Sequence, residues 1–127
     1  MSYVFDSSSI YALLSKPSVL GGNYTITLAK FELGNTVWKE VFLHRRISRE
    51  EGLKLISFIS NVLDIMNLED VNSAEDVEIA TDYGITFYDA SYVWLARKLN
   101  LPLVTQVNKL MKAVEGKLEV LSTKDVK

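Results

Sequence analysis

Residues 2–9, SYVFDSSS, decide how the rest of this chain is interpreted, because they place a carboxylate where a strand meets a helix. Residues 2–5 are predicted to form a short buried strand, and Asp6 follows directly. Ser7 or Ser8 is then expected to cap a helix. Open α/β sheets bind ligands in the crevice at the carboxyl ends of their strands, so Asp6 is expected at a binding edge.

The remainder of the chain alternates short strands with helices. Further strands are predicted at 24–27, 64–68, 101–105 and 118–121, and further helices at 28–43, 48–62, 73–84, 86–99 and 108–114. Ser48 and Glu51 form a capping-box pattern at the start of one of these helices. Strands alternating with helices predict an α/β fold with a largely parallel sheet covered on both faces. The last residues, 123–127, are expected to fray.

Composition limits the class of protein. A chain of 127 residues is expected to form one domain, residues 1–127. It has no cysteine, which fits a reducing cytoplasm. No apolar stretch approaches the roughly 20 residues of a membrane span, so no membrane association is expected. The net charge of −2 does not favour nucleic-acid binding by the protein as a whole, so any polyanion site has to be local.

Two further acids stand near helix starts, and each has an ordinary structural explanation. Five residues of helix 28–43 lie on one apolar arc: Leu28, Phe31, Trp38, Val41 and Phe42. Glu32 lies at the edge of this arc, or is simply exposed, and Asn35 falls inside it, where a buried amide needs a hydrogen-bond partner. Asp89 follows Thr86 in a capping pattern, which alone explains an acid there. If Asp6, Glu32 and Asp89 converge, they form a site for a hard divalent cation.

Several other catalytic mechanisms are excluded because the chain lacks the residues or motifs that they need. The chain has no glycine-rich phosphate loop and no nucleophile elbow. A cysteine nucleophile is impossible, and His44, the single histidine, lies near basic residues at a helix end, where a cation suits the helix dipole. Carboxylate–metal chemistry is what remains for an enzyme.

Four stretches in order resemble the PIN domain, most closely the small VapC-type toxins. They are YVFDSSS (3–9), FELGN (31–35), YDASYVWLA (88–96) and LVT (103–105), and the resemblance covers nearly the whole chain. It implies a three-layer α/β/α sandwich with a mostly parallel central sheet. It also implies Mg²⁺ or Mn²⁺ bound by clustered acids, an RNA substrate, an antitoxin partner and a homodimer.

Individual positions carry over from this resemblance. Asp6, Glu32 and Asp89 match the first three acids, with Ser7, Asn35 and Thr105 as supporting residues. The family's fourth acid is replaced by Val107, which cannot bind a metal, and Asn108 would reach the site only if the loop were shifted. The candidates for holding substrate phosphates are Arg45, Arg97, Lys109 and Lys112. The alternative explanation is that these basic residues lie at solvated helix ends and faces.

The expected function is therefore a metal-dependent endoribonuclease of the toxin–antitoxin type. The alternative is a catalytically degenerate PIN domain that binds RNA or protein, which the loss of the acid at Val107 favours. A homodimer is also supported by the number of large aromatic residues, which are enriched at interfaces. They are Tyr3, Tyr11, Tyr24, Trp38, Phe58 and Trp94, and the alternative is that all of them lie in the core.

Overall fold

A five-stranded parallel sheet forms the centre of the computed structural model, which describes residues 1–126. The strands are β1 (Val4–Phe5), β2 (Tyr24–Ile26), β3 (Asn67–Glu69), β4 (Leu103–Val104) and β5 (Val120–Leu121), in the order β3-β2-β1-β4-β5. Every neighbouring pair is parallel, which confirms the predicted sheet. Because β1 is the central strand, Asp6 leaves the sheet at its middle.

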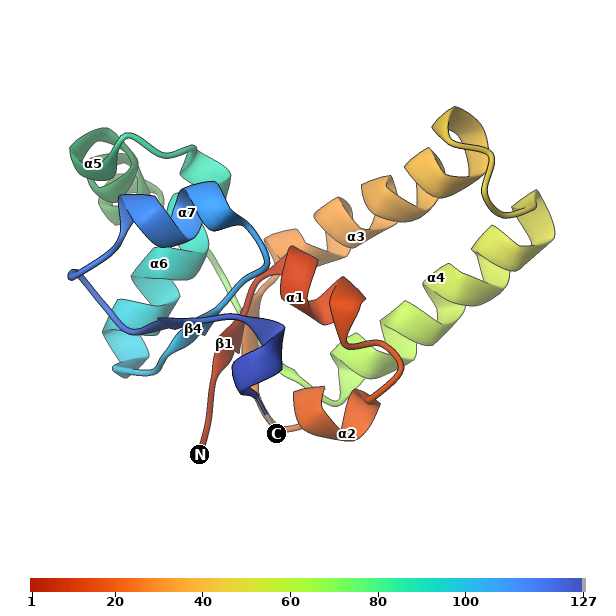
Figure 1. Cartoon of the computed structure of the whole chain (residues 1–127), viewed down its shortest axis with the longest axis horizontal. Helices are drawn as coiled ribbons and strands as arrows, with labels where there is room; N and C mark the ends of the chain where they lie inside the picture. Colours follow the sequence, from red (N-terminus) through yellow and green to blue (C-terminus); the bar gives the residue numbers. More distant parts are fainter. Residues whose placement is uncertain (127) are drawn as a thin grey trace.

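Helices cover both faces of the sheet, as expected for three layers (Figure 1). They are α1 (Ser7–Ala12), α2 (Pro17–Leu20), α3 (Leu28–Trp38), α4 (Arg49–Asp64), α5 (Ser73–Tyr83), α6 (Phe87–Leu99) and α7 (Asn108–Ala113), with a π-helical segment η1 (Lys39–Leu43) and a 3₁₀ segment η2 (Thr123–Asp125). Alternate strand residues face opposite layers. Phe5 packs with α1 to α4, and Val4 packs with α5 to α7. No helix within residues 1–126 has the length and apolar character to cross a membrane.

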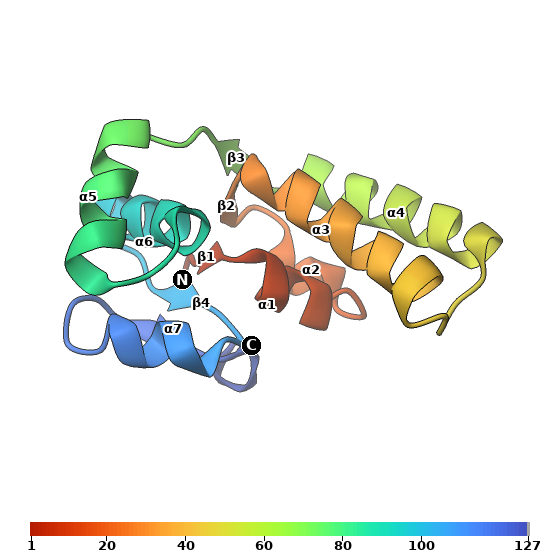
Figure 2. The ribbon, with the colours of Figure 1, turned by 90° about the horizontal axis from the view of Figure 1, so that it is seen from above.

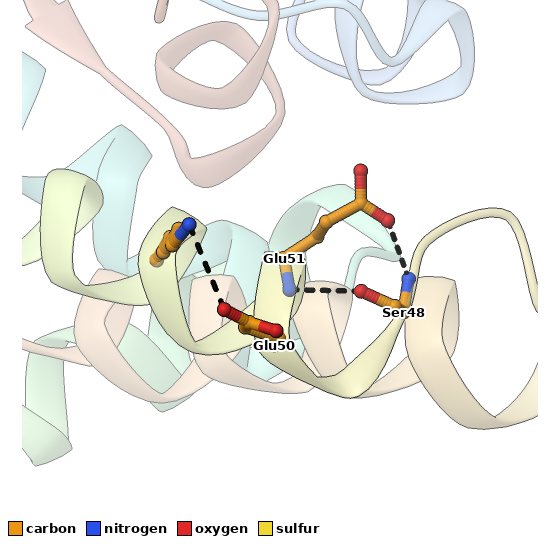
Figure 3. Close-up of polar contacts among 4 residues, drawn as sticks. Ser48, Glu50 and Glu51 are labelled. Atoms are coloured by element: carbon orange, nitrogen blue, oxygen red, sulfur yellow. Dashed lines mark hydrogen bonds and ion pairs between the residues drawn. The ribbon is translucent and has the colours of Figure 1, made fainter.

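The helices α3 and α4 form an antiparallel hairpin that projects away from α5, α6 and α7 (Figures 1 and 2). The predicted capping box starts α4: the Ser48 hydroxyl accepts from the Glu51 N–H at 3.0 Å, and the Glu51 carboxylate accepts from the Ser48 N–H at 2.8 Å (Figure 3). Gly52 lets the two arms approach closely, since a Cβ there would lie 2.5 Å from the Val41 side chain.

Several predicted element ends are wrong by a few residues. The N-cap of α1 is Asp6 itself rather than Ser7 or Ser8, because the Asp6 carboxylate accepts from the Ser9 N–H. The strand predicted at 64–68 begins only at Asn67, because α4 continues through Asp64.

Two further predictions at element ends need correction. Asn72, not Ser73, caps α5. Residues 123–125 of the supposedly frayed tail form η2, capped by Ser122; Lys127 lies outside the described residues.

The apolar arc predicted for α3 and η1 lies mostly at the surface, and only Leu28 and Val41 of its members are half-buried. The buried residues of this helix are Ala29, Leu33 and Val37. Phe31, Trp38 and Phe42 are instead 74%, 48% and 60% exposed. Because apolar residues occur all around the helix, periodicity selected the wrong face. Asn35 lies on this exposed side, so the prediction that it is a buried amide is wrong.

Candidate metal centre and active site

Asp6 occupies the end of β1 and is held there by three hydrogen-bond donors. Its Oδ1 accepts from the Ser8 hydroxyl at 2.7 Å and from the Ser9 N–H at 2.9 Å. Its Oδ2 accepts from the Thr105 hydroxyl. Only 3% of Asp6 is exposed. Burial raises its pKa, and these hydrogen bonds offset part of that effect by stabilising the anion.

Ser8 and Thr105 join two loops that are far apart in sequence. The Ser8 hydroxyl also accepts from the Gln106 N–H at 3.0 Å, and the Thr105 hydroxyl accepts from the Val107 N–H at 3.1 Å. The turn after β1 and the loop after β4 are therefore locked together around Asp6. These contacts fit the supporting role predicted for Thr105.

Glu32 reaches the same region from the second turn of α3. Its Oε1 accepts from the buried Tyr92 hydroxyl at 2.6 Å. Burial raises the pKa of Glu32; hydrogen bonds from Tyr92 and Ser7 lower it, and the charges of Asp6 and Asp89 raise it further. The Tyr92 hydroxyl is thus the hydrogen-bond partner of Glu32 from the opposite helix.

Asp89 lies in the first turn of α6, where its N–H donates to the Thr86 hydroxyl at 3.0 Å. The predicted cap is confirmed. Burial raises the pKa of Asp89 and the Asp6 carboxylate raises it further, while Thr86 and Lys109 lower it. A capping role and a place beside Asp6 are therefore compatible.

The three acids lie near enough to influence one another electrostatically, because the charge of Asp6 raises the pKa of both Glu32 and Asp89. In residues 1–126, however, no three His, Cys, Asp or Glu side chains are arranged to hold a metal ion directly. The expected bridging of one ion by all three carboxylates is thus not present in this arrangement. An all-oxygen donor set still suits Mg²⁺ or Mn²⁺, since Mg²⁺ usually retains several waters. The residues fit an ion that is bound partly through water.

Val107 occupies the loop position where the family has its fourth acid. It is the N-cap residue of α7, has an extended backbone and is 37% exposed. Asn108 begins α7 and is also exposed. This loop directly follows Thr105, which donates to the Asp6 carboxylate, but neither Val107 nor Asn108 supplies a carboxylate of its own.

The basic candidates divide by position. Lys109 lies beside Asp89, whose pKa it lowers, and Lys112 follows on α7. Arg45 belongs to the loop 44–48 that joins η1 to α4. This loop forms the far tip of the hairpin (Figure 1). Arg97 lies in the last turn of α6, where it donates to the Tyr83 hydroxyl at 2.8 Å. It is about 12 Å along the helix from Asp89. Arg45 and Arg97 therefore do not lie at the edge that holds the acids.

Two functional candidates were missed from the sequence. Ser8 was considered only as a cap, because a run of three serines gives no sign of which hydroxyl reaches Asp6. Tyr92 lies three residues after Asp89, on the buried face of α6. A buried tyrosine needs a hydrogen-bond partner for its hydroxyl, and this need can be recognised from the sequence. Which residue serves as the partner is decided only by the fold.

No family model matches the chain. A curated relative, Exonuclease VapC9 from Pyrobaculum aerophilum, is 31% identical, and the alignment covers 94% of this chain and 91% of the relative. The chain belongs to the VapC-type PIN-domain family.

Solved structures agree with this membership. The crystal structure of PAE2754 from Pyrobaculum aerophilum superimposes with a TM-score of 0.82 at 26% identity, over 98% of this VapC-type chain and 90% of that one. The VapBC2 structure from Rickettsia felis, bound to a DNA fragment from their promoter, gives a TM-score of 0.66 at 16% identity, over 96% and 98% of the chains. The second likeness shows the shared fold alone. The predicted α/β fold and the resemblance to the PIN domain are confirmed.

Proposed function

We propose that this VapC-type protein is a metal-dependent ribonuclease of a cytoplasmic toxin–antitoxin pair. The observation that supports this most is Asp6: a carboxylate at the end of the central strand, 3% exposed, held by three donors and electrostatically coupled to Glu32 and Asp89. Burying one acid beside two others is costly in a protein without a cation to bind. Such clusters are typical of functional sites.

Asp6, Glu32 and Asp89 would hold Mg²⁺ or Mn²⁺, directly or through water. A bound divalent ion lowers the pKa of a coordinated water and neutralises charge on a scissile phosphate. Ser8 and Thr105 orient the Asp6 carboxylate, and Ser7 contributes beside Glu32. Asn108 is a further supporting candidate, because it is the first residue of α7 and follows the loop that contacts Asp6.

Lys109 is the strongest candidate for contact with substrate phosphate. It is exposed, and its charge acts on Asp89. With valine at position 107, a second metal ion lacks its anionic ligand, so a lysine at this edge would supply positive charge near the phosphate. Lys112 is the next candidate on the same helix.

The test is cleavage of a panel of structured RNAs with Mn²⁺ and with EDTA, comparing wild type with Asp6→Asn. We expect cleavage with Mn²⁺ only, and a loss of at least about 100-fold in the variant, since even outer-shell changes at metal sites cost 10- to 100-fold. Asp82→Asn, at an exposed position on α5, is the matched control and should cleave like wild type. Cleavage that persists in EDTA would exclude the metal mechanism.

The mode of attack is a separate question, because the curated relative is named an exonuclease. We propose internal cleavage. A circular RNA has no ends, so an endonuclease opens it and an exonuclease leaves it intact. Cutting of linear RNA combined with resistance of the same sequence as a circle would replace the endonuclease proposal with an exonuclease.

A degenerate, non-cutting PIN domain is the alternative, supported by Val107 and by the absence of a direct three-ligand arrangement in residues 1–126. On this reading the protein binds RNA in gel shifts but does not cut it with any divalent ion. Calorimetry with Mn²⁺ distinguishes the two, because the nuclease must bind the ion in the absence of RNA.

Partners are proposed from the exposed aromatic residues Phe31, Trp38 and Phe42, which we call the aromatic face. Trp38 and Phe42 stack with ring centroids 5.5 Å apart. Of the aromatics first proposed for an interface, Trp38 and Phe58 are exposed, while Tyr3, Tyr11, Tyr24 and Trp94 are half-buried.

We propose that a second copy covers the aromatic face in the free protein, and that an antitoxin is the protein partner in the cell. Sedimentation should show a dimer at micromolar concentration, weakened by Phe31→Ser. A monomer at that concentration would exclude the homodimer.

A further inference from the structure

Tyr92 connects two elements of the site through its hydroxyl. It lies on α6, one turn after Asp89, and is only 1% exposed. Its hydroxyl donates to Oε1 of Glu32 on α3, sixty residues away in sequence, at 2.6 Å. Glu32 and Asp89 are thereby tied to one another through α6.

We propose that Tyr92 is a positioning residue that holds the Glu32 carboxylate in the orientation needed to bind a divalent ion. This inference rests on the proposed metal-dependent function and assigns a role that neither the three acids nor Thr105 supplies. Asp6 is oriented by the Ser8 and Thr105 hydroxyls, whereas Glu32 accepts first from a tyrosine on another helix, with Ser7 as a second donor.

A glutamate side chain has several freely rotating bonds and loses much conformational entropy when it is ordered. A hydrogen bond formed during folding orders it before the ion arrives, which is how outer-shell partners raise metal affinity. Because Val107 supplies no ligand, the affinity depends more on the order of the three acids that remain.

The Tyr92 hydroxyl is buried together with its ring. A phenylalanine at this position would bury the same ring without the cost of a buried polar group. The short distance to Glu32 shows where the hydroxyl is satisfied. The competing explanation is that the bond merely satisfies a buried tyrosine and contributes to stability alone.

A double-mutant cycle measured by Mn²⁺ calorimetry separates these explanations. Wild type, Tyr92→Phe, Glu32→Gln and the double variant are titrated as full chains. We expect Tyr92→Phe to weaken Mn²⁺ binding by about tenfold, and to have no further effect in the Glu32→Gln background. If the bond contributed to stability alone, Tyr92→Phe would unfold more easily but would bind Mn²⁺ like wild type.

Tyr83→Phe is the matched control, because it also removes a hydrogen-bonded hydroxyl, the one that accepts from Arg97, away from the acids. It should bind Mn²⁺ like wild type. Wild-type affinity in Tyr92→Phe, or an equal loss in both backgrounds, would overturn the inference while leaving the proposed nuclease intact.

Should Tyr92→Phe not fold, Glu32→Asp tests the same contact from the other side, since it keeps the charge but draws the carboxylate away from the hydroxyl. It should also weaken Mn²⁺ binding, and unchanged affinity would overturn the inference. A wild-type protein that binds no Mn²⁺ at all would overturn both the inference and the proposed function.

Discussion

Two buried aspartates in this protein have opposite surroundings. Asp6, at the centre of the sheet edge, is 3% exposed and accepts three hydrogen bonds. Asp76, in the first turn of α5, is 0% exposed, and neither of its carboxylate oxygens has a hydrogen-bond partner within the described residues 1–126. Burial raises the pKa of both, that of Asp76 to about 6.

The difference shows what a prepared anion site requires. At Asp6, hydroxyl and backbone donors from two loops stabilise the charged carboxylate and offset part of the effect of burial on its pKa. At Asp76, burial raises the pKa and the negative charge of Glu75 raises it further, so the charged form of the carboxyl group is penalised. A raised pKa by itself therefore does not distinguish a carboxylate at a binding site from one that only destabilises the fold. The presence of hydrogen-bond donors to the carboxylate does distinguish them.

The largest expected effect is on stability at Asp76. A pKa raised from 3.8 to about 6 corresponds to about 3 kcal/mol. The unfolded state releases this proton at lower pH than the folded state does. The contribution of Asp76 to folding is therefore fully present below pH 3.8 and is lost as pH rises through about 6. Asp76→Asn should then be more stable than wild type at pH 8, and the gain should shrink toward pH 4.

Urea unfolding of metal-free protein at both pH values provides the measurement. Asp82→Asn, on the same helix but exposed, should change stability little at either pH. If Asp76→Asn is no more stable than wild type at pH 8, Asp76 has a partner in solution and the contrast with Asp6 disappears.

Removing a donor should make Asp6 resemble Asp76. Thr105→Val keeps the shape of the side chain but deprives the Asp6 carboxylate and the Val107 N–H of their shared hydroxyl. We expect Mn²⁺ affinity to fall by about 10- to 100-fold, as for other outer-shell changes at metal sites. Calorimetry measures it, with Thr81→Val on the exposed face of α5 as the control. Unchanged affinity would show that Thr105 does not prepare Asp6 for a cation.

The pH dependence of metal binding sharpens the comparison. Burial raises the pKa of Asp6, Glu32 and Asp89, and protons compete with a metal for these carboxylates. Mn²⁺ should bind at least about tenfold more tightly at pH 8 than at pH 5. Asp76→Asn should show the same dependence, because Asp76 takes no part in binding. Equal wild-type affinity at the two pH values would contradict the assignment of these acids as ligands.

The smallest expected effect concerns Val107, which caps α7 without a side-chain hydrogen bond. Both Val107→Asp and Val107→Asn supply a capping side chain, worth about 1 kcal/mol of stability. Only the aspartate adds a negative ligand, so only it should raise Mn²⁺ affinity, by severalfold, together with RNA cleavage. Because Val107 is partly exposed, a charge there should not unfold the protein. No gain for aspartate over asparagine would favour the degenerate alternative.

Local sequence signals predicted much of this fold. The Ser48 capping box and the Thr86 cap were identified correctly, and the alternation of strands and helices predicted the parallel sheet. The predictions were wrong where a local sequence pattern was compatible with two different buried faces or element ends. The α3 helix is apolar on more than one side, so the sequence could not show that Ala29, Leu33 and Val37 face the core and Asn35 the solvent.

The sequence by itself determined the chemistry available to this protein: carboxylates without cysteine, one histidine, and valine where the family has a fourth acid. It also determined that Asp6 ends the first strand, because that depends on neighbouring residues alone. Only the tertiary structure decided that Ser8 links Asp6 to the Gln106 N–H, that Tyr92 meets Glu32 across sixty residues, and that Asp76 is buried without a hydrogen-bond partner among residues 1–126. These contacts join segments distant in the chain, and side-chain periodicity does not specify which groups such packing brings together.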